Sequence, residues 1–130
     1  DGRYHLFYKG NTKDEHGREY INGIQQATSR KIRGPWKEDF KYLDAYAGIT
    51  PVEGSGIFKL NGKDEYVLMY DLYTNGRYEY QTSTNLYEFT KEPKSFSKNF
   101  FPRHGTVCSV TAEELQRLQQ KWGYVLPSED

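Results

Sequence analysis

The stretch NGKDEYVLMY, residues 61–70, predicts a polar turn that leads directly into a buried β-strand. Glycine, asparagine and aspartate favour turns, whereas a run of aromatic and aliphatic residues fits a pleated, half-buried surface. Residues 1–8, DGRYHLFY, repeat this order of turn and strand. Each stretch is followed by a second expected strand that ends in Thr-Ser, at Ser29 in one copy and at Ser83, 54 positions later, in the other.

This internal repeat predicts an all-β fold of the propeller kind. A unit of several strands cannot bury both of its faces alone and must stack on neighbours. A period of roughly 50 to 60 residues is typical of propeller blades rather than of a solenoid. A closed propeller usually has about four to eight blades, so two units predict a fragment. The start of the chain on an expected hairpin turn, Asp1-Gly2, favours the same interpretation.

Composition agrees with a β fold and disfavours two classes of partner. The chain has 12 Tyr, 7 Phe and 2 Trp, and such residues suit strands as well as sugar binding. The 18 basic and 18 acidic residues are interspersed without a basic stripe, so we expect no nucleic acid partner. No segment approaches the roughly 20 apolar residues that a membrane span needs, so we expect no membrane partner.

The C-terminal segment predicts a short amphipathic α-helix. Thr111 and Glu114 have the spacing of a capping box, in which each side chain satisfies a backbone donor near the other residue. Apolar residues then recur at helical spacing from Leu115 to Trp122, and Gly123 is a suitable C-cap. We expect this helix to have a packing role.

Residues 51–56, PVEGSG, form the first candidate functional motif. Glu53 lies beside glycines at the expected junction between a loop and an apolar strand, and glycine lets another group approach the backbone closely. The apolar neighbours Val52 and Ile57 reduce the solvation of the carboxylate and favour its protonated form, which a general acid needs. The same spacing also fits an ordinary surface glutamate in a glycine turn, so the residues alone leave both interpretations open.

Arg103 and His104 form the second candidate. Arginine presents a planar, permanently charged fork to hydroxyl or carboxylate partners. His104 can donate to a substrate hydroxyl, or contact a metal ion or its waters. A surface arginine and a core histidine bonded to the backbone would fit the same sequence. One histidine does not make a Ca²⁺ site, because Ca²⁺ usually takes about six or more oxygen ligands.

Three further reactive residues carry no catalytic signal. His5 lies on an expected strand and His16 in a charged loop, so we interpret both as structural or solvated. Cys108 has no His or Asn at a diagnostic spacing, and we expect a buried, inert thiol. As the single cysteine, it excludes an internal disulfide.

The order of the motifs resembles glycoside hydrolase family 43, in its arabinofuranosidase and xylosidase-like branches. These motifs are PVEGSGIFKLNG at 51–62, EYVLMYD at 65–71 and FFPRHGTV at 100–107. In the first half of the chain, DGRYHLFY at 1–8 and the later QATS and GPW motifs are typical of a blade in that family. The resemblance spans about Asp1 to Leu118.

The resemblance implies a five-bladed β-propeller. Residues 1–130 would then be the C-terminal part of its single catalytic domain, roughly the last two blades with a short C-terminal helix. Members of the family hold three carboxylates in a central depression: an Asp as general base, a second Asp that tunes and orients the donor, and a Glu as general acid. Glu53 matches the general acid, although Ser55 stands where many relatives have Pro.

The resemblance places the two catalytic aspartates before this chain, the second just upstream of Asp1. Asp44 and Asp71 are therefore assigned to neither role, and we interpret Asp71, expected after a strand, as a structural or supporting group. In relatives the Arg of the Arg-His-Gly strand lies near the sugar and the His near a central cation or water. This implies substrate binding by Arg103 and His104, and metal contact by His104.

The implied activity of the intact protein is hydrolysis of arabinose- or xylose-containing glycosidic bonds of plant polysaccharides, with inversion. We expect no required cofactor, a structural Ca²⁺ at the propeller centre as an option, and a secreted or periplasmic location. The isolated chain should be inactive, because its general base is missing. The alternative is a degenerate relative or a propeller that binds carbohydrate without cleaving it.

Overall fold

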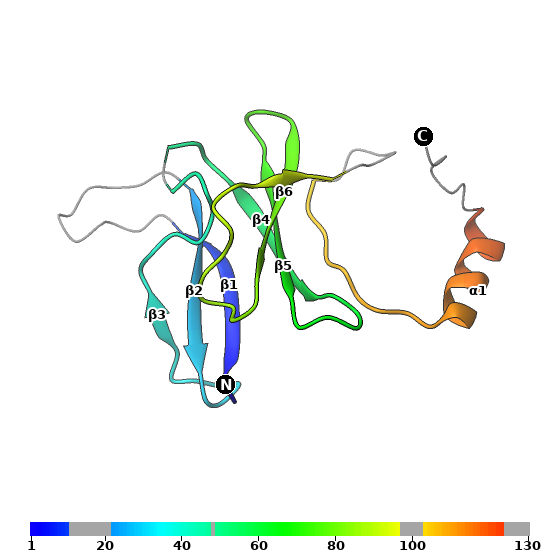
Figure 1. Ribbon diagram of the computed structural model, residues 1–130, viewed down its shortest axis with the longest axis horizontal. Coiled ribbons are helices and arrows are strands. Elements are labelled where there is room, and N and C mark those ends of the chain that lie inside the picture. Colours follow the sequence, from blue (N-terminus) through cyan, green and yellow to red (C-terminus); the bar gives the residue numbers. More distant parts are fainter. Residues whose placement is uncertain (11–21, 48, 97–102, 124–130) are drawn as a thin grey trace.

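The computed structural model describes residues 1–10, 22–47, 49–96 and 103–123. Two antiparallel sheets and one short helix make up this part of the chain (Figure 1). The elements are β1 (Tyr4–Gly10), β2 (Gly23–Ser29), β3 (Lys37–Asp39), β4 (Glu53–Lys59), β5 (Tyr66–Leu72), β6 (Arg77–Ser83), β7 (Lys94–Ser95) and α1 (Ala112–Trp122).

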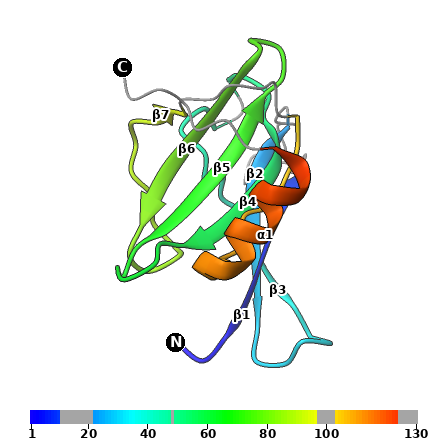
Figure 2. The same cartoon turned by 90° about the vertical axis from the view of Figure 1, so that its right-hand side faces the viewer.

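Each sheet has its strands in chain order. The first is β1-β2-β3 and the second is β4-β5-β6-β7. Figure 2 looks onto the second sheet, where β4 to β7 lie side by side. The fold is therefore mainly β, as expected, and these two sheets alone do not form a closed propeller.

The internal repeat appears in the strand register. Tyr4 pairs with Ser29 across β1 and β2, and Tyr66 pairs with Ser83 across β5 and β6. The two copies of the repeat thus form equivalent antiparallel pairs, although β4 precedes the pair in the second copy. The edge strand that follows the pair in the second copy is β7.

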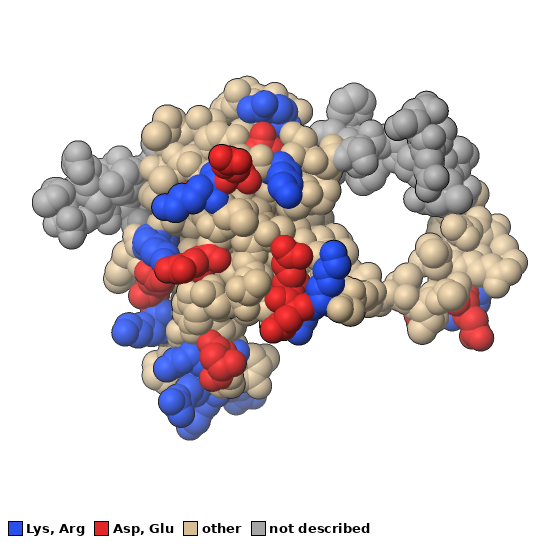
Figure 3. All heavy atoms as spheres, viewed as in Figure 1, with Lys and Arg blue, Asp and Glu red and all other residues tan. Residues whose placement is uncertain are grey.

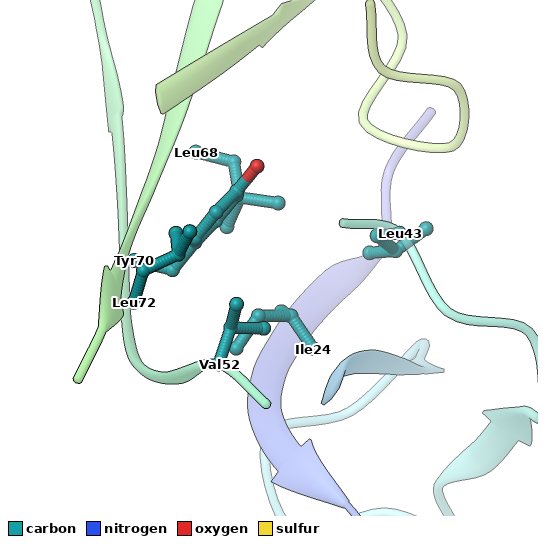
Figure 4. Packing of buried hydrophobic residues seen from close by; sticks show 6 residues of the cluster. All are labelled: Ile24, Leu43, Val52, Leu68, Tyr70 and Leu72. Atoms are coloured by element: carbon teal, nitrogen blue, oxygen red, sulfur yellow. The ribbon is translucent and has the colours of Figure 1, made fainter. Parts of the chain in front are cut away.

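The core lies between the two sheets (Figure 4). It consists of Ile24, Leu43, Val52, Leu68, Tyr70 and Leu72, all buried. Burial of each large apolar side chain stabilises the fold by about 1.5–3 kcal/mol. Phe7 of β1 and Phe89 meet edge to face at 6.2 Å between ring centres and extend this contact between the sheets.

A turn at residues 43–47 connects the sheets through hydrogen bonds. The buried carboxylate of Asp44 accepts from the backbone N–H groups of Ile24 at 2.8 Å, Tyr46 at 3.0 Å and Ala47 at 2.9 Å. Burial nevertheless raises the pKa of Asp44. Gln81 of β6 accepts from the N–H of Ala45 at 3.0 Å, so the turn is bonded to both sheets. Asp44 is a structural residue.

Glu53 lies at the junction between a loop and a strand, as expected: it is the first residue of β4, which continues past a β-bulge between Glu53 and Gly56. Two other expectations about local structure need correction. Asp71 lies within β5 rather than after a strand. Cys108 is exposed and not buried, because the segment that carries it is not part of either sheet. His16 lies outside the described residues.

Helix α1 forms as predicted, but its apolar side stays exposed. Thr111 and Glu114 form the capping box, with Glu114 Oε2 accepting from the Thr111 N–H at 2.8 Å. Leu115, Leu118 and Trp122 are exposed, so the expected packing role is absent among the described residues. The reason is position: an extended segment carries the helix away from the sheets (Figure 1).

The charged side chains show no separation by sign. Figure 3 shows Lys and Arg interspersed with Asp and Glu over the visible face of the molecule. In the part of the chain that is described, no helix combines the length and the apolar character needed to cross a membrane.

Candidate active site

The strand register aligns three polar side chains across the second sheet. Glu53 of β4 pairs with Asp71 of β5, which in turn pairs with Tyr78 of β6. Residues directly opposite on antiparallel strands project from the same face, and like charges in such positions repel. The two neighbouring carboxylates therefore need cationic or hydrogen-bonding partners.

Two glycines in β4 let a distant segment approach this row. Gly54 has a φ of +63°, and a Cβ at this position would overlap with the imidazole ring of His104. A Cβ on Gly56 would lie 3.1 Å from the carbonyl oxygen of Gly105. Residues 103–105 therefore run directly against the backbone of β4, where a larger residue would push them away.

Glu53 lies between two groups that can carry positive charge. His104 Nε2 is 3.5 Å from one carboxylate oxygen of Glu53, and Lys9 Nζ is 3.5 Å from the other. Lys9 reaches it from β1, which lies beside β4; Ser55 donates to the carbonyl of Phe7 at 3.3 Å across this junction. The Glu53 side chain is 23% exposed, so it remains accessible to a ligand.

Asp71 is more deeply buried, with a side-chain exposure of 4%. Its Oδ2 accepts from Nε of Arg103 at 3.1 Å and lies 4.0 Å from Nε2 of His104. The structure thus brings together the three residues that the motifs singled out, Glu53, Arg103 and His104, and adds Asp71 between them.

Tyr78 completes the row by supporting the backbone of β4. Its hydroxyl donates to the carbonyl oxygen of Gly54 at 3.2 Å. Burial, and then the nearby Asp71 carboxylate, raise the pKa of Tyr78. The phenol therefore stays protonated at neutral pH and keeps donating, which holds Gly54 in the conformation that accommodates His104.

This arrangement can bind and position polar groups and can exchange a proton at Glu53. The carboxylate is accessible, Arg103 is largely exposed and His104 is half-exposed. Hydroxyl-rich ligands need donors and acceptors of this kind. The buried Asp71 carboxylate does not serve this purpose, because it is paired with Arg103.

The remaining predicted candidates lie elsewhere. Asp44 is in the core turn. His5 is bonded to the Asp1 carboxylate at 3.1 Å and to the Gln26 amide at 2.7 Å, in agreement with a structural role. Cys108 lies beside the β4–β5 hairpin, among the residues that line a surface hollow.

The described residues do not by themselves fit a Ca²⁺ ion. No group of three or more His, Cys, Asp and Glu side chains is arranged to hold a metal within the described ranges. Near His104, the oxygen donors are Glu53 and Asp71, and Asp71 is already bonded to Arg103. An ion with about six oxygen ligands would need most of them from elsewhere.

Sequence reasoning missed Lys9 and Tyr78 and undervalued Asp71. Lys9 gave no signal, because its contact with Glu53 depends on how β1 and β4 lie together. The signal for Asp71 was present: a carboxylate inside the apolar run VLMYDL requires a partner, since charged groups are rarely buried unpaired.

Comparison with known proteins identifies the family. Residues 1–116 match the family model of a "probable glycosyl hydrolase domain" related to glycoside hydrolase family 43. No curated protein and no solved structure matches the chain. The match covers most of the 130 residues, so the chain belongs to this glycoside hydrolase 43-related family.

Proposed function

We propose that this chain is the acid-bearing part of an inverting glycoside hydrolase, with Glu53 as the general acid. The intact protein would cleave arabinose- or xylose-containing bonds of plant polysaccharides or their oligosaccharides. Arg103 and His104 would bind the sugar. The family supports a glycosidase-related function and a carbohydrate substrate, and the remaining details are our proposal.

The observation that carries the proposal is the position of Glu53. It is an accessible carboxylate on a rigid strand, and Gly54 brings His104 to within 3.5 Å of it. In an inverting enzyme such an acid protonates the leaving oxygen while a base activates water on the opposite face of the sugar. The acid and base then stand roughly 6.5–9.5 Å apart, which leaves room for that water.

The general base is proposed to lie outside residues 1–130. Asp71 is nearly inaccessible and bonded to Arg103, and Asp44 is buried with three N–H donors on its carboxylate. Neither carboxylate is free to activate a water. The isolated chain should therefore bind a sugar weakly and fail to cleave it.

Further propeller blades are supported by the outer face of the first sheet. Leu6, Tyr8, Trp36 and Phe40 line one hollow there, and Leu6 and Phe40 are exposed. An exposed apolar face of this kind is what a stacked neighbouring blade would cover. We propose that residues 1–130 supply two blades of a five-bladed domain. A structural Ca²⁺, held mainly by other parts of that domain, and a secreted or periplasmic location remain proposals.

The test uses the full-length gene product with aryl α-arabinofuranosides and β-xylosides that differ in leaving group. Glu53→Gln should lower kcat about 10²- to 10⁴-fold for a poor leaving group and much less for a good one, because only the poor one needs a proton. Glu92→Gln, at an exposed position, is the control and should leave kcat unchanged. Equal rates for Glu53→Gln and wild type on both substrates would reject the general-acid role.

A second candidate, carbohydrate binding without cleavage, is favoured by one contact. Lys9 Nζ lies 3.5 Å from Glu53, so an acceptor and a donor stand side by side, an arrangement that can hold sugar hydroxyls without cleaving a bond. Titration calorimetry with arabino- and xylo-oligosaccharides separates the two candidates. Binding with no product after prolonged incubation indicates the binding protein, whereas release of an inverted sugar, read by NMR, indicates the hydrolase.

A further inference from the structure

The buried carboxylate of Asp71 has its ion-pair partners on a segment that neither sheet holds. Among the described residues these partners are Arg103 and His104. Residues 103–110 belong to no strand, so they lack a backbone ladder with the sheet. A further side-chain hydrogen bond, from Ser109 to Asn61 at 2.8 Å, holds the C-terminal end of this segment, away from Arg103 and His104.

We propose that Asp71 is a positioning residue that holds Arg103 and His104 against Glu53 and thereby sets substrate affinity. The inference rests on the proposed function, in which Arg103 and His104 bind the sugar. Asp71 itself is too buried to touch a ligand and acts through its partners.

The geometry at Arg103 explains how this works. Asp71 Oδ2 accepts a hydrogen bond from the Nε–H of the Arg103 guanidinium at 3.1 Å. Guanidinium carries five N–H donors in one plane, so fixing Nε fixes the direction of the two terminal nitrogens. The Arg103 side chain is 72% exposed, which leaves those terminal nitrogens facing solvent and available to hydroxyl groups of a sugar.

The geometry at His104 links the same carboxylate to the proposed acid. The imidazole Nε2 lies 3.5 Å from Glu53 and 4.0 Å from Asp71, and the ring covers Gly54. Because Glu53 and Asp71 are register partners on paired strands, His104 lies between two carboxylates whose spacing the sheet sets. Loss of the Asp71 charge would free both residues of the 103–104 pair.

A double-mutant cycle in the full-length gene product tests the proposal. Asp71→Asn and Arg103→Met should each raise KM about tenfold, with a smaller change in kcat, because the first weakens the orientation of the guanidinium and the second removes the guanidinium. The double variant should raise KM by much less than the product of the two single effects, since Asp71 acts in large part through Arg103. Independent, multiplying effects on KM would overturn the proposal.

A matched control lies on the same hairpin. Asp64 forms an exposed ion pair with Lys59 at 2.8 Å, far more open to solvent than the pair of Asp71. Asp64→Asn should leave KM and kcat as in the wild type. An equal rise of KM in Asp64→Asn would mean that charge loss anywhere on the hairpin is sufficient, which also overturns the proposal. Arg103→Lys keeps a positive charge beside the buried Asp71 carboxylate, so it should fold even if Asp71→Asn does not, and loss of the planar guanidinium should still raise KM.

A readout without turnover separates this inference from the proposed function. In protein labelled with ¹⁵N-arginine, the Arg103 Nε–H should exchange with solvent at least about tenfold more slowly than an unbonded arginine, and Asp71→Leu, which leaves no acceptor, should remove most of this protection. If the wild type cleaves no glycoside but the protection is present, the proposed function fails and the positioning role stands. Unprotected Nε–H in the wild type overturns the positioning role.

Discussion

The imidazole of His104 lies over the α-carbon of Gly54, so closely that the glycine cannot be given a side chain without moving the ring. The contact joins a residue of β4 to one some fifty positions later in the chain, and it places His104 3.5 Å from Glu53. The candidate site therefore depends on a backbone position as much as on its polar side chains.

Gly54→Ala should abolish most of the activity at a moderate cost in stability. The left-handed conformation costs a non-glycine residue about 1–2 kcal/mol, and the new Cβ displaces His104. Gly76→Ala is a matched control, because Gly76 has the same φ of +63° and open space around its α-carbon. Both variants should lose similar free energy of unfolding, while only Gly54→Ala loses kcat/KM. Equal kinetics for the two would show that the His104 contact is irrelevant to the reaction.

Lys9→Met should lower activity with little effect on stability. An ion pair that is partly exposed stabilises a protein by about 0–1 kcal/mol, so the melting temperature should hardly move. Lys9 Nζ lies 3.5 Å from one carboxylate oxygen of Glu53 and helps to hold that side chain in place, so its loss should lower kcat several-fold. The control is Lys59→Met, which breaks an exposed Lys–Asp pair at a distance from the site. An unchanged kcat in Lys9→Met contradicts the expectation.

Asp44→Ala should destabilise the fold without a specific effect on the site. Three backbone N–H groups, of Ile24, Tyr46 and Ala47, would lose their acceptor. Leaving buried donors unsatisfied costs about 1–3 kcal/mol, measured as the free energy of unfolding in urea. Asp44→Asn keeps one oxygen and should lose less. A loss below about 0.5 kcal/mol in Asp44→Ala would mean that water replaces the carboxylate.

Acidification should destabilise the protein through His5. Burial is the largest cause that lowers the pKa of His5, and Arg3 acts in the same direction. The unfolded chain, with a His pKa near 6.5, therefore takes up the proton first. The free energy of unfolding should fall as the pH drops below about 6.5, until the folded pKa is passed.

His5→Gln should remove this contribution. The free energy of unfolding of the wild type minus that of His5→Gln should fall as the pH is lowered from about 7.5 to 5.5. Measuring the difference cancels most contributions of other titrating groups. A difference that does not depend on pH would indicate that the Asp1 carboxylate, 3.1 Å from the ring, offsets the burial of His5.

Much of the architecture followed from local patterns. The turn-and-strand order of residues 61–70 predicted β5, and its repeat at 1–8 predicted β1. The capping box predicted the start of α1. These predictions succeeded because turn chemistry, strand alternation and helix capping are decided by residues within a few positions of one another.

Burial in the C-terminal segment could not be predicted in the same way. Leu115 and Trp122 have helical spacing, which indicates an apolar side of a helix but not whether another element covers it. Cys108 was expected to be buried because free cysteines commonly are. Both errors have one cause: the path of residues 103–111 depends on contacts with β4 and β5, far away in the sequence.

The sequence by itself determined which residues are candidates, namely Glu53 beside its glycines and the Arg103–His104 pair, because their residue types and motif order are local properties. Only the tertiary structure decided that they belong together. Strand pairing set Asp71 opposite Glu53, and the packing of β1 against β4 brought Lys9 to the same carboxylate. Charge interactions fall off with distance through space, so the network around Glu53 exists only once the sheets have formed.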